Sequence, residues 1–328
     1  MWYNSPLGEL LMPKRKIVVA GSILVDRINE VDAYPGLGEL TQIRALSRVS
    51  GGLVPNTGMD VHILAPDIPV AAFGKVGRDE DGDFVVSVLE KAGLDVSGIV
   101  RSEKPTSFTN VVSVRGGERT FFTYPGASAD WGYDDFPFEK VSPGDIVLLG
   151  YFLLLDRIDA GEGEKILKKL KEIGAMTAID LVSENSDRYS LVRKCLPYVD
   201  YLIVNETEAQ RIAGVGGDTQ DRETCEALMR LGVREKVIIH RPERGVLLQK
   251  GGVFAQRPCV KIPEGFIKGK TGAGDAYCAG ALTAIFRGLS PDETLTCGAV
   301  AAVGALSAPG ATEGMKTMDE LKAVCESL

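Results

Sequence analysis

The sequence predicts a doubly wound α/β protein, in which a mostly parallel sheet is covered by helices on both faces. Along the 328 residues, apolar runs of strand length alternate with helical patterns. A strand that is apolar at nearly every position is buried on both faces, and alternation with helices indicates parallel βαβ units. The runs are KIVVAGSI (16–23), VAAFGKVG (70–77), DIVLLGYF (145–152), AMTAIDLV (175–182), VDYLIVN (199–205) and KVIIHR (236–241).

One intervening helix is predicted over residues 81–93, DGDFVVSVLEKAG. Its apolar residues fall on one side of a helix, as expected for a helix that packs on a sheet. Gly93 is suited to ending it, because glycine readily adopts the left-handed conformation found after helices.

Two further regions alternate polar and apolar residues, at 27–49 and 106–124, and RGGER (115–119) is typical of a hairpin turn. Strands of this kind bury only one face, so we expect a small β-sheet that covers one edge of the body as a lid. The predicted organisation is therefore an N-terminal extension at 1–13, to which we assign no role, and one domain at 14–328 that includes the lid strands.

Composition excludes several classes of partner. The formal net charge is −8 and the lysines are dispersed, which argues against nucleic acid and against an anionic membrane surface. The apolar run IVVAGSILV is too short to span a membrane. Six scattered cysteines without a C-x-x-C pair are typical of reduced thiols, so we expect a cytoplasmic protein. Both histidines, His62 and His240, are interpreted as ordinary structural or surface residues.

The stretch KGKTGAGDAYCAGAL (268–282) suggests a phosphate site in two incompatible ways. A P-loop requires G-x-x-x-x-G-K-[ST], but only three residues separate Gly265 from Gly269, so the lysine is out of frame. The alternative is a small-residue turn that opens a helix at about Asp275. The helical pattern that follows, with Gly288 as its end, favours this second interpretation.

The second interpretation predicts chemistry as well as structure. Gly272, Ala273 and Gly274 place backbone N–H groups at a helix N-terminus, where unpaired amides and the helix dipole bind an anion such as a phosphoryl group. Asp275 beside them is suited to orienting an attacking hydroxyl and taking its proton. The structural alternative is an aspartate that merely compensates the helix dipole.

At this point the sequence resembles the PfkB, or ribokinase-like, family of carbohydrate kinases. TGAGDAYCAG (271–280) resembles the C-terminal signature of that family, in which the aspartate is the catalytic base. The resemblance extends over about residues 16–326 and implies a ribokinase-like fold. It also rests on VVAGSILVD (18–26), SGGLVPNTG (50–58), FGKVGRDEDG (73–82), GGERTFFTYPGA (116–127) and VDYLIVNETEA (199–209).

The resemblance also implies binding residues, and their chemistry suits the roles. On the acceptor side these are Asp26, Gly51, Gly52 and Asn56. An ionised carboxylate accepts hydrogen bonds from sugar hydroxyls, and the glycines let backbone approach a ligand. Mg²⁺ is expected near Asn205 and Glu208, through water, although N-x-x-E also fits a capping box. For the nucleotide the expected residues are Asn205, Gly245, Thr271, Gly272 and Gly274, with Ala305–Gly310 near adenine or ribose.

Two positions depart from the family pattern. His240 and Pro242 stand where the family commonly has threonine and glycine, which puts a hydroxyl contact to the nucleotide in doubt. Gly269-Lys270-Thr271 stands where relatives have Asp-Thr-x, whose aspartate helps to hold a monovalent cation. Because Lys270 carries a positive charge of its own, we expect that potassium is not needed.

These observations predict an ATP-dependent sugar kinase that transfers the γ-phosphoryl group to a hydroxyl of a small carbohydrate, with Asp275 as base and Mg²⁺ on the phosphates. The alternatives are a nucleoside or pseudouridine kinase, with Phe108, Phe122 and Tyr124 of the lid as candidate base contacts, and a non-catalytic sugar-binding regulator. Since exposed lid strands leave open edges, a homodimer through the lid is also expected.

Overall fold

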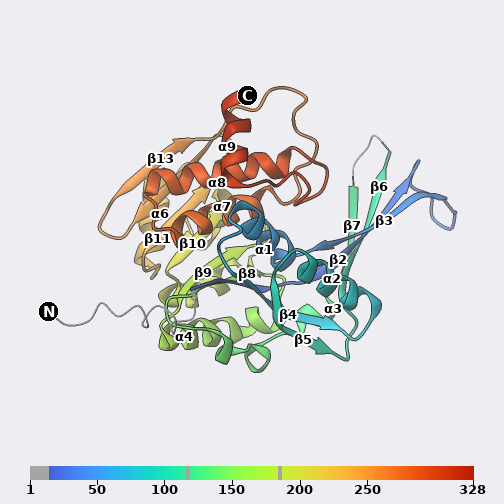
Figure 1. Ribbon diagram of the computed structural model, residues 1–328, viewed down its shortest axis with the longest axis horizontal. Coiled ribbons are helices and arrows are strands. Elements are labelled where there is room, and N and C mark those ends of the chain that lie inside the picture. Colours follow the sequence, from blue (N-terminus) through green and yellow to red (C-terminus); the bar gives the residue numbers. More distant parts are fainter. Residues whose placement is uncertain (1–14, 116–118, 184–186) are drawn as a thin grey trace.

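The computed structural model describes residues 15–115, 119–183 and 187–328. The predicted extension at 1–13 and the tip of the predicted RGGER turn lie outside the described residues. Within the described part the strands form two sheets, and helices lie on both sides of the larger one (Figure 1). The predicted α/β fold class is confirmed.

The larger sheet has nine strands in the described residues, and seven adjacent ones run parallel to one another. Its order is β13 (Phe254–Pro258), β12 (Arg244–Gln249), β11 (Lys236–His240), β10 (Tyr201–Asn205), β9 (Met176–Leu181), β8 (Ile146–Phe152), β1 (Ile17–Gly21), β4 (Val70–Gly77) and β5 (Asp95–Ser102). β12 runs antiparallel to both of its neighbours, β11 and β13. Every apolar run predicted as a strand forms a parallel strand of this sheet, whereas the sequence patterns did not indicate β5, β12 and β13.

Alternate residues of β1 enter different hydrophobic clusters, as expected for a strand buried on both faces. Ile17 and Val19 join one cluster, and Val18 and Ala20 join the other. The first cluster includes α1 (Leu53–Leu64), α2 (Glu80–Lys91), α7 (Ala273–Phe286), α8 (Pro291–Leu306) and α9 (Met318–Ser327). The second includes α4 (Gly163–Ile173), α5 (Glu206–Ala213) and α6 (Asp221–Arg230).

Short helical turns occupy several connections. They are α3 (Gly126–Ala129), the 3-10 turns Tyr133–Asp135, Phe138–Lys140, Arg188–Lys194 and Leu196–Tyr198, and a π turn at Ile158–Glu162. The predicted helix at 81–93 is α2, which begins at Glu80 because the Asp79 side chain caps it by accepting the N–H of Gly82.

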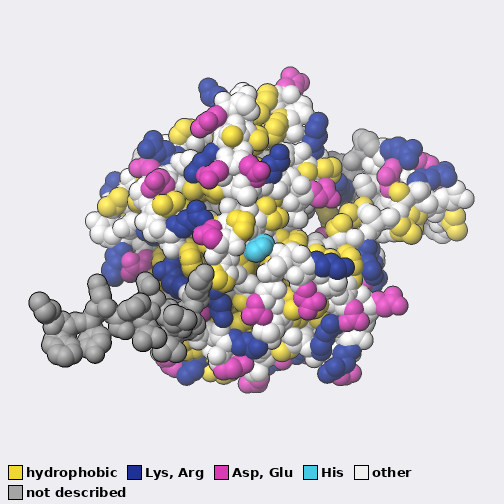
Figure 2. Space-filling model, in the orientation of Figure 1, with side chains coloured by type: hydrophobic (Ala, Val, Ile, Leu, Met, Phe, Trp, Pro, Cys, Tyr) yellow, Lys and Arg dark blue, Asp and Glu magenta, His cyan; other side chains and the backbone are white. Residues whose placement is uncertain are grey.

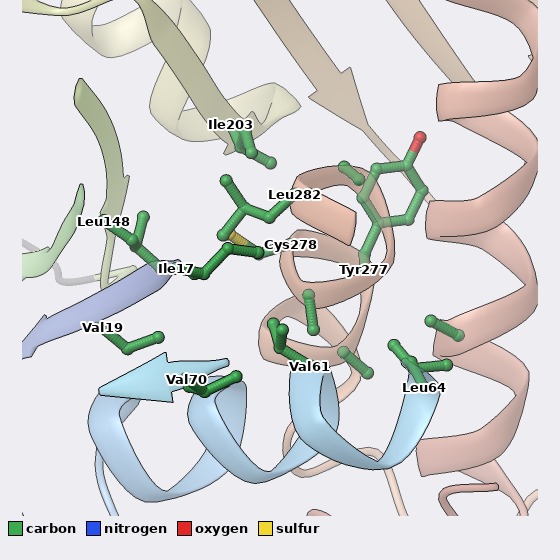
Figure 3. Packing of buried hydrophobic residues seen from close by; sticks show 14 of the residues in the cluster. Ile17, Val19, Val61, Leu64, Val70, Leu148, Ile203, Tyr277, Cys278 and Leu282 are labelled. Carbon is green, nitrogen blue, oxygen red and sulfur yellow. The ribbon is translucent and has the colours of Figure 1, made fainter. Parts of the chain in front are cut away.

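Helix α7 lies inside the molecule, between the sheet and α8. In Figure 3 the sheet residues Ile17 and Leu148 point toward Cys278 and Leu282 of α7. A Cβ atom on Gly280 would lie 2.3 Å from the carbonyl oxygen of Cys297, so only glycine permits α8 to approach this closely. The small residues of the signature stretch therefore allow α7, the helix that carries Asp275, to pack in the interior of the protein.

The smaller sheet has four strands, in the order β3 (Ile43–Gly51), β2 (Leu24–Val31), β6 (Ser107–Val114) and β7 (Arg119–Tyr124). It projects from one end of the body (Figure 1). β2 is parallel to β6, and the two outer pairs are antiparallel. We call this sheet the lid.

One face of the lid packs on α2. Arg27 and Arg48 reach the carboxylate of Asp81 at 2.5 and 3.1 Å, and the Arg27 guanidinium lies 4.0 Å from the centre of the Phe108 ring. Because side chains alternate along a strand, Asp26 points to the opposite face. The two faces of β2 therefore have different partners.

The surface shows no segregation of charge on the face drawn in Figure 2, where basic and acidic side chains are mixed. None of the helices in the described ranges combines the length and apolar character that crossing a membrane requires. Large exposed apolar side chains gather on the lid and its β2–β3 connection. They are Tyr34, Leu37, Leu40, Ile43, Leu46, Val49, Phe121, Phe122 and Tyr124.

Candidate active site

The N-terminus of α7 is a tight turn made by small residues. Gly272 is the N-cap, with φ of 78°, and a Cβ there would lie 2.6 Å from the Cβ of Ala311. The helix begins at Ala273, two residues before the predicted start, because Ala273 and Gly274 already have helical geometry. Amides in the first turn have no carbonyl partner within the helix, so this end can hold an anion.

Asp275 lies in that first turn and is nearly buried, with 6% exposure. Its Oδ2 accepts hydrogen bonds from Asn56 Nδ2 at 2.9 Å and from Tyr151 Oη at 3.0 Å. Asn56 comes from α1 and Tyr151 from the carboxyl end of β8. Both donors of the described residues use the same oxygen, so Oδ1 is the oxygen left for a ligand.

A cavity of about 190 Å³ collects carboxyl groups beside this turn. Asp275, Asp180 and Glu208 line it, together with Lys270. Burial raises the pKa of Asp275, and Glu208 adds to the rise, while the hydrogen bonds from Asn56 and Tyr151 oppose it. Burial, followed by the charges of Asp275 and Glu208, also raises the pKa of Asp180. Crowded acids of this kind favour a bound cation.

Asn205 and Glu208 form a capping box at the start of α5, so the structural interpretation of N-x-x-E is correct. Asn205 Oδ1 accepts the N–H of Glu208, and Glu208 Oε2 accepts the N–H of Asn205. Glu208 Oε1 accepts from Ser183 at 2.7 Å. Within the described ranges no three acidic, histidine or cysteine side chains are grouped to hold a metal directly. The acid-lined cavity still fits Mg²⁺ that keeps its waters.

A second cavity, of about 1160 Å³, adjoins the first and is large enough for a nucleotide. Lys270 and Gly274 line both cavities, and so does His240, whose ring stacks on Tyr277 with 4.8 Å between centroids. Burial lowers the pKa of His240 to about 4, so its imidazole is neutral at neutral pH. Apolar side chains form part of the wall, including Val260, Ile262, Ile267, Val303 and Leu306.

Some expected nucleotide residues lie elsewhere. Gly245 is not among the residues that line this cavity, because it packs under Tyr277: a Cβ there would lie 2.2 Å from the phenol oxygen. Thr271 lines neither cavity, whereas its neighbour Lys270 lines both. Within 305–310 only Leu306 lines the larger cavity.

Asp26 and the glycine pair, which are expected to bind the acceptor, lie close together. A Cβ on Gly51 would lie 2.5 Å from Asp26 Oδ2, and a Cβ on Gly52, whose φ is 90°, would lie 2.7 Å from the Ser22 carbonyl oxygen. Leu53, the next residue, begins α1, whose first turn carries Asn56. The turn at Gly51 and Gly52 therefore lies against Asp26 and leads directly into the helix whose Asn56 binds Asp275.

Burial raises the pKa of Asp26 to about 6, against an opposing hydrogen bond from Thr109. Thr109 of β6 lies directly opposite Asp26 of β2. The hydroxyl oxygens of Thr109 and Thr123 are 3.2 Å apart. This face of the lid therefore offers a carboxylate and hydroxyls to a polar ligand.

The aromatic residues named as candidate base contacts lie on the other face of the lid. The Phe108 ring is tilted against that of Tyr124, with 5.3 Å between centroids, and the Arg27 guanidinium lies over it on the side that packs on α2. Phe122 shares this face, because it is two residues from Tyr124 on β7. The structure thus contradicts their use as base contacts beside Asp26.

Sequence reasoning missed Tyr151 and Asp180 as site residues. Both stand at the ends of apolar runs that were correctly predicted as strands, where they were treated as part of the core. For Asp180, the signal was available as a carboxylate at the carboxyl end of a parallel strand, the edge at which α/β proteins bind ligands. For Tyr151 no pattern in the sequence indicated its contact with Asp275.

Because burial raises the pKa of Asp26, the ionised carboxylate should lower the free energy of unfolding of the protein. Asp26→Asn should increase the free energy of unfolding by about 1–3 kcal/mol at pH 8, because the folded protein no longer ionises a partly buried carboxyl. The folded pKa exceeds the unfolded one, so the gain should fade between pH 6 and pH 4. Urea unfolding at pH 8 and at pH 4 measures the difference in the free energy of unfolding between the variant and the unaltered protein. The exposed Asp32→Asn is the control, and an equal change at both pH values would contradict the explanation.

Comparison with known proteins places the chain in a family. Residues 14–318 match the model of the pfkB family of carbohydrate kinases. Ribokinase of Arabidopsis thaliana is 25% identical over 309 residues, which cover 91% of this chain and 78% of the relative. The 5-dehydro-2-deoxygluconokinase of Clostridium perfringens is 25% identical over 329 residues, with 94% and 93% covered.

The fold agrees with solved structures. The structure of Arabidopsis thaliana ribokinase complexed with ribose and ATP superimposes with a TM-score of 0.80 at 22% identity, covering 95% of this chain and 99% of that one. The family match spans both sheets and the stretch that forms the α7 turn. The chain therefore belongs to the pfkB family of carbohydrate kinases, which phosphorylate sugars or nucleosides.

Proposed function

We propose that the protein transfers the γ-phosphoryl group of ATP to a hydroxyl of a small carbohydrate, with Asp275 as the base. The observation that carries this proposal is the position of Asp275. Its carboxylate lies in the first turn of α7, beside unpaired amides, in the smaller of two adjoining cavities. A helix terminus that holds an anion and a carboxylate that orients a hydroxyl are the two groups phosphoryl transfer needs.

In this proposal the acceptor hydroxyl donates its hydrogen bond to Oδ1 of Asp275, the oxygen that no described residue occupies. The carboxylate takes the proton as the new P–O bond forms, since an alcohol has little tendency to ionise beforehand. The amides of Gly274 and Asp275 and the ammonium of Lys270 stabilise negative charge on the phosphoryl oxygens. The positions of Lys270 and Gly274 on both cavity walls support this assignment.

Mg²⁺ would be held through water by Glu208 and Asn205, and it supplies neutralisation of charge on the phosphates. Glu208 is suited to this role because its carboxylate is fixed by the capping box and by Ser183. On the acceptor side, Asp26 accepts hydrogen bonds from two sugar hydroxyls, while Gly51 and Gly52 keep that surface free of side chains and Asn56 borders it. The lid excludes water from the transfer. Because all six cysteines are free, we assign the protein to the cytoplasm.

The direct test measures ADP release from Mg-ATP across a panel of neutral sugars, sugar acids and nucleosides. One sugar should stimulate turnover, and Asp275→Asn should lower kcat by about a hundredfold or more, because the amide cannot accept the proton. Asp319→Asn is a matched control, since Asp319 is an exposed carboxylate in the first turn of α9. An aspartate that only compensates a helix dipole would give small effects in both variants.

The outcomes separate the alternatives. Stimulation by nucleosides alone would replace the sugar with a nucleoside acceptor. Binding of a sugar without any turnover would favour the regulator and contradict the proposed function. Full activity of Asp275→Asn would remove the assigned base while leaving the kinase family in place.

A second prediction concerns potassium. Lys270 provides positive charge beside the turn of α7, so replacing sodium by potassium at about 100 mM should change kcat by less than about twofold. Lys270→Ala should lower kcat/KM for ATP by about ten- to a hundredfold, because a charge that stabilises the transferring group is lost. Strong activation by potassium in the unaltered protein would contradict this role of Lys270.

A third prediction concerns a homodimer through the lid. β3 and β7 are the free edges of the lid sheet, and apolar side chains such as Leu46 and Phe121 are exposed there, at 73% and 61%. Sedimentation equilibrium at micromolar concentration should therefore show a dimer, and Phe121→Asp should shift it toward monomer. Val253→Asp, at an exposed apolar residue of the body, is the control. A monomer at all concentrations would contradict the proposal.

A further inference from the structure

We propose that Tyr151 is a positioning residue for phosphoryl transfer, whose phenol holds one oxygen of Asp275 so that the other faces the acceptor hydroxyl. The proposal rests on the assignment of Asp275 as base. It adds a residue that neither the signature stretch nor the predicted site contained. Tyr151 acts through Asp275 and needs no contact with substrate.

The contacts of Asp275 define this role. Tyr151 Oη lies 3.0 Å and Asn56 Nδ2 lies 2.9 Å from Oδ2. A carboxylate turns easily about its Cβ–Cγ bond, but donors from two separate elements, β8 and α1, fix the plane of this one. The base is thereby oriented before any ligand binds, which is the condition for efficient proton transfer.

The backbone at Tyr151 is unusual in a way that serves this contact. Its φ is 59°, in the left-handed region that bulky residues seldom adopt. β8 loses its regular register with β9 between Leu149 and Phe152, so Tyr151 leaves the sheet ladder at this point. Strain of this kind persists where the surroundings impose it, and it clusters at functional sites. Here it accompanies a side chain that lines the cavity of Asp275.

Two glycines allow the chain to make this turn. Gly150 precedes Tyr151 and pairs with Gly21 of β1. A Cβ on Gly21 would lie 2.5 Å from the Gly150 carbonyl oxygen, and a Cβ on Gly150 would lie 2.6 Å from Leu53. The backbone before Tyr151 is therefore clamped between β1 and the start of α1, which also carries Asn56. Both donors to Asp275 are built on one tightly packed region.

The electrostatics favour a neutral, permanent donor. Burial, followed by the charges of Asp275 and Asp180, raises the pKa of Tyr151 well above its usual value, so the phenol keeps its proton over the working pH range. Its hydrogen bond favours the ionised form of Asp275, against burial and Glu208. The other groups around this carboxylate are Asp60 of α1, Asp180 of β9, Glu208 of α5, His240 of β11, Lys270 before α7 and Cys278 of α7. Loss of the phenol should therefore raise the pKa of Asp275.

Tyr151→Phe tests the proposal because it removes one oxygen and keeps the ring. We expect kcat at pH 8 to fall about tenfold, while KM for ATP and for the acceptor changes less than about threefold. The acid limb of the kcat profile should move to higher pH by about one unit. Tyr201→Phe is the matched control, since Tyr201 is a buried tyrosine at the opposite end of a parallel strand. The pH at which kcat falls on the acid side does not depend on how much of the protein is folded. A variant that only reduced the amount of folded protein would therefore leave this pH unchanged.

The double variant separates this inference from the proposed function. If Tyr151 acts through Asp275, Tyr151→Phe should lower the residual activity of Asp275→Asn by less than about twofold. Additive losses, or an unshifted acid limb in Tyr151→Phe, would overturn the role of Tyr151 and leave the base assignment intact. Full activity of Asp275→Asn would overturn both.

Discussion

The candidate active site depends on one constraint. The carboxylate of Asp275 must stay ionised and oriented inside the protein, at the N-terminus of the buried helix α7. Burial raises the pKa of Asp275 and so disfavours its ionised form. The helix amides and the donors Asn56 and Tyr151 offset that tendency. Because these donors stand on α1 and β8, the proposed base is held in this orientation only when both elements have packed against α7. The site and the core therefore form together.

The parallel sheet supplies the means of convergence. Strands that run in the same direction end at the same edge, and this edge carries the polar groups of the site. Tyr151 follows the regular part of β8, Asp180 is the penultimate residue of β9, Asn205 ends β10 and His240 ends β11. In the lid, by contrast, successive side chains of β2 point to opposite faces of the sheet, so neighbouring residues have different partners. Asp26 lies on the face proposed to bind the acceptor, while its neighbour Arg27, on the other face, joins the lid to α2 through Asp81.

Sequence patterns predicted six of the seven parallel strands and the α7 turn because each depends on local chemistry: continuous apolar runs, or small residues before an aspartate. They missed β5, β12 and β13, which are less uniformly apolar than the central strands. They also could not decide which face of the lid Phe108 occupies, since alternation gives two faces without saying which one binds. Tyr151 was hidden because its role depends on a left-handed backbone conformation and on contact with a helix 124 residues away.

The identity of the two donors also has a physical reason. A lysine or arginine beside Asp275 would fix the carboxylate equally well, but an adjacent cation lowers a carboxyl pKa by about 1–3 units and so weakens the base. Neutral donors orient the group with a smaller loss of basicity. The surrounding acids, Asp180 and Glu208, act in the opposite direction and raise the pKa. Asn56 and Tyr151 thus oppose the effect of burial without removing the proton affinity that Asp275 needs for its proposed role as a base.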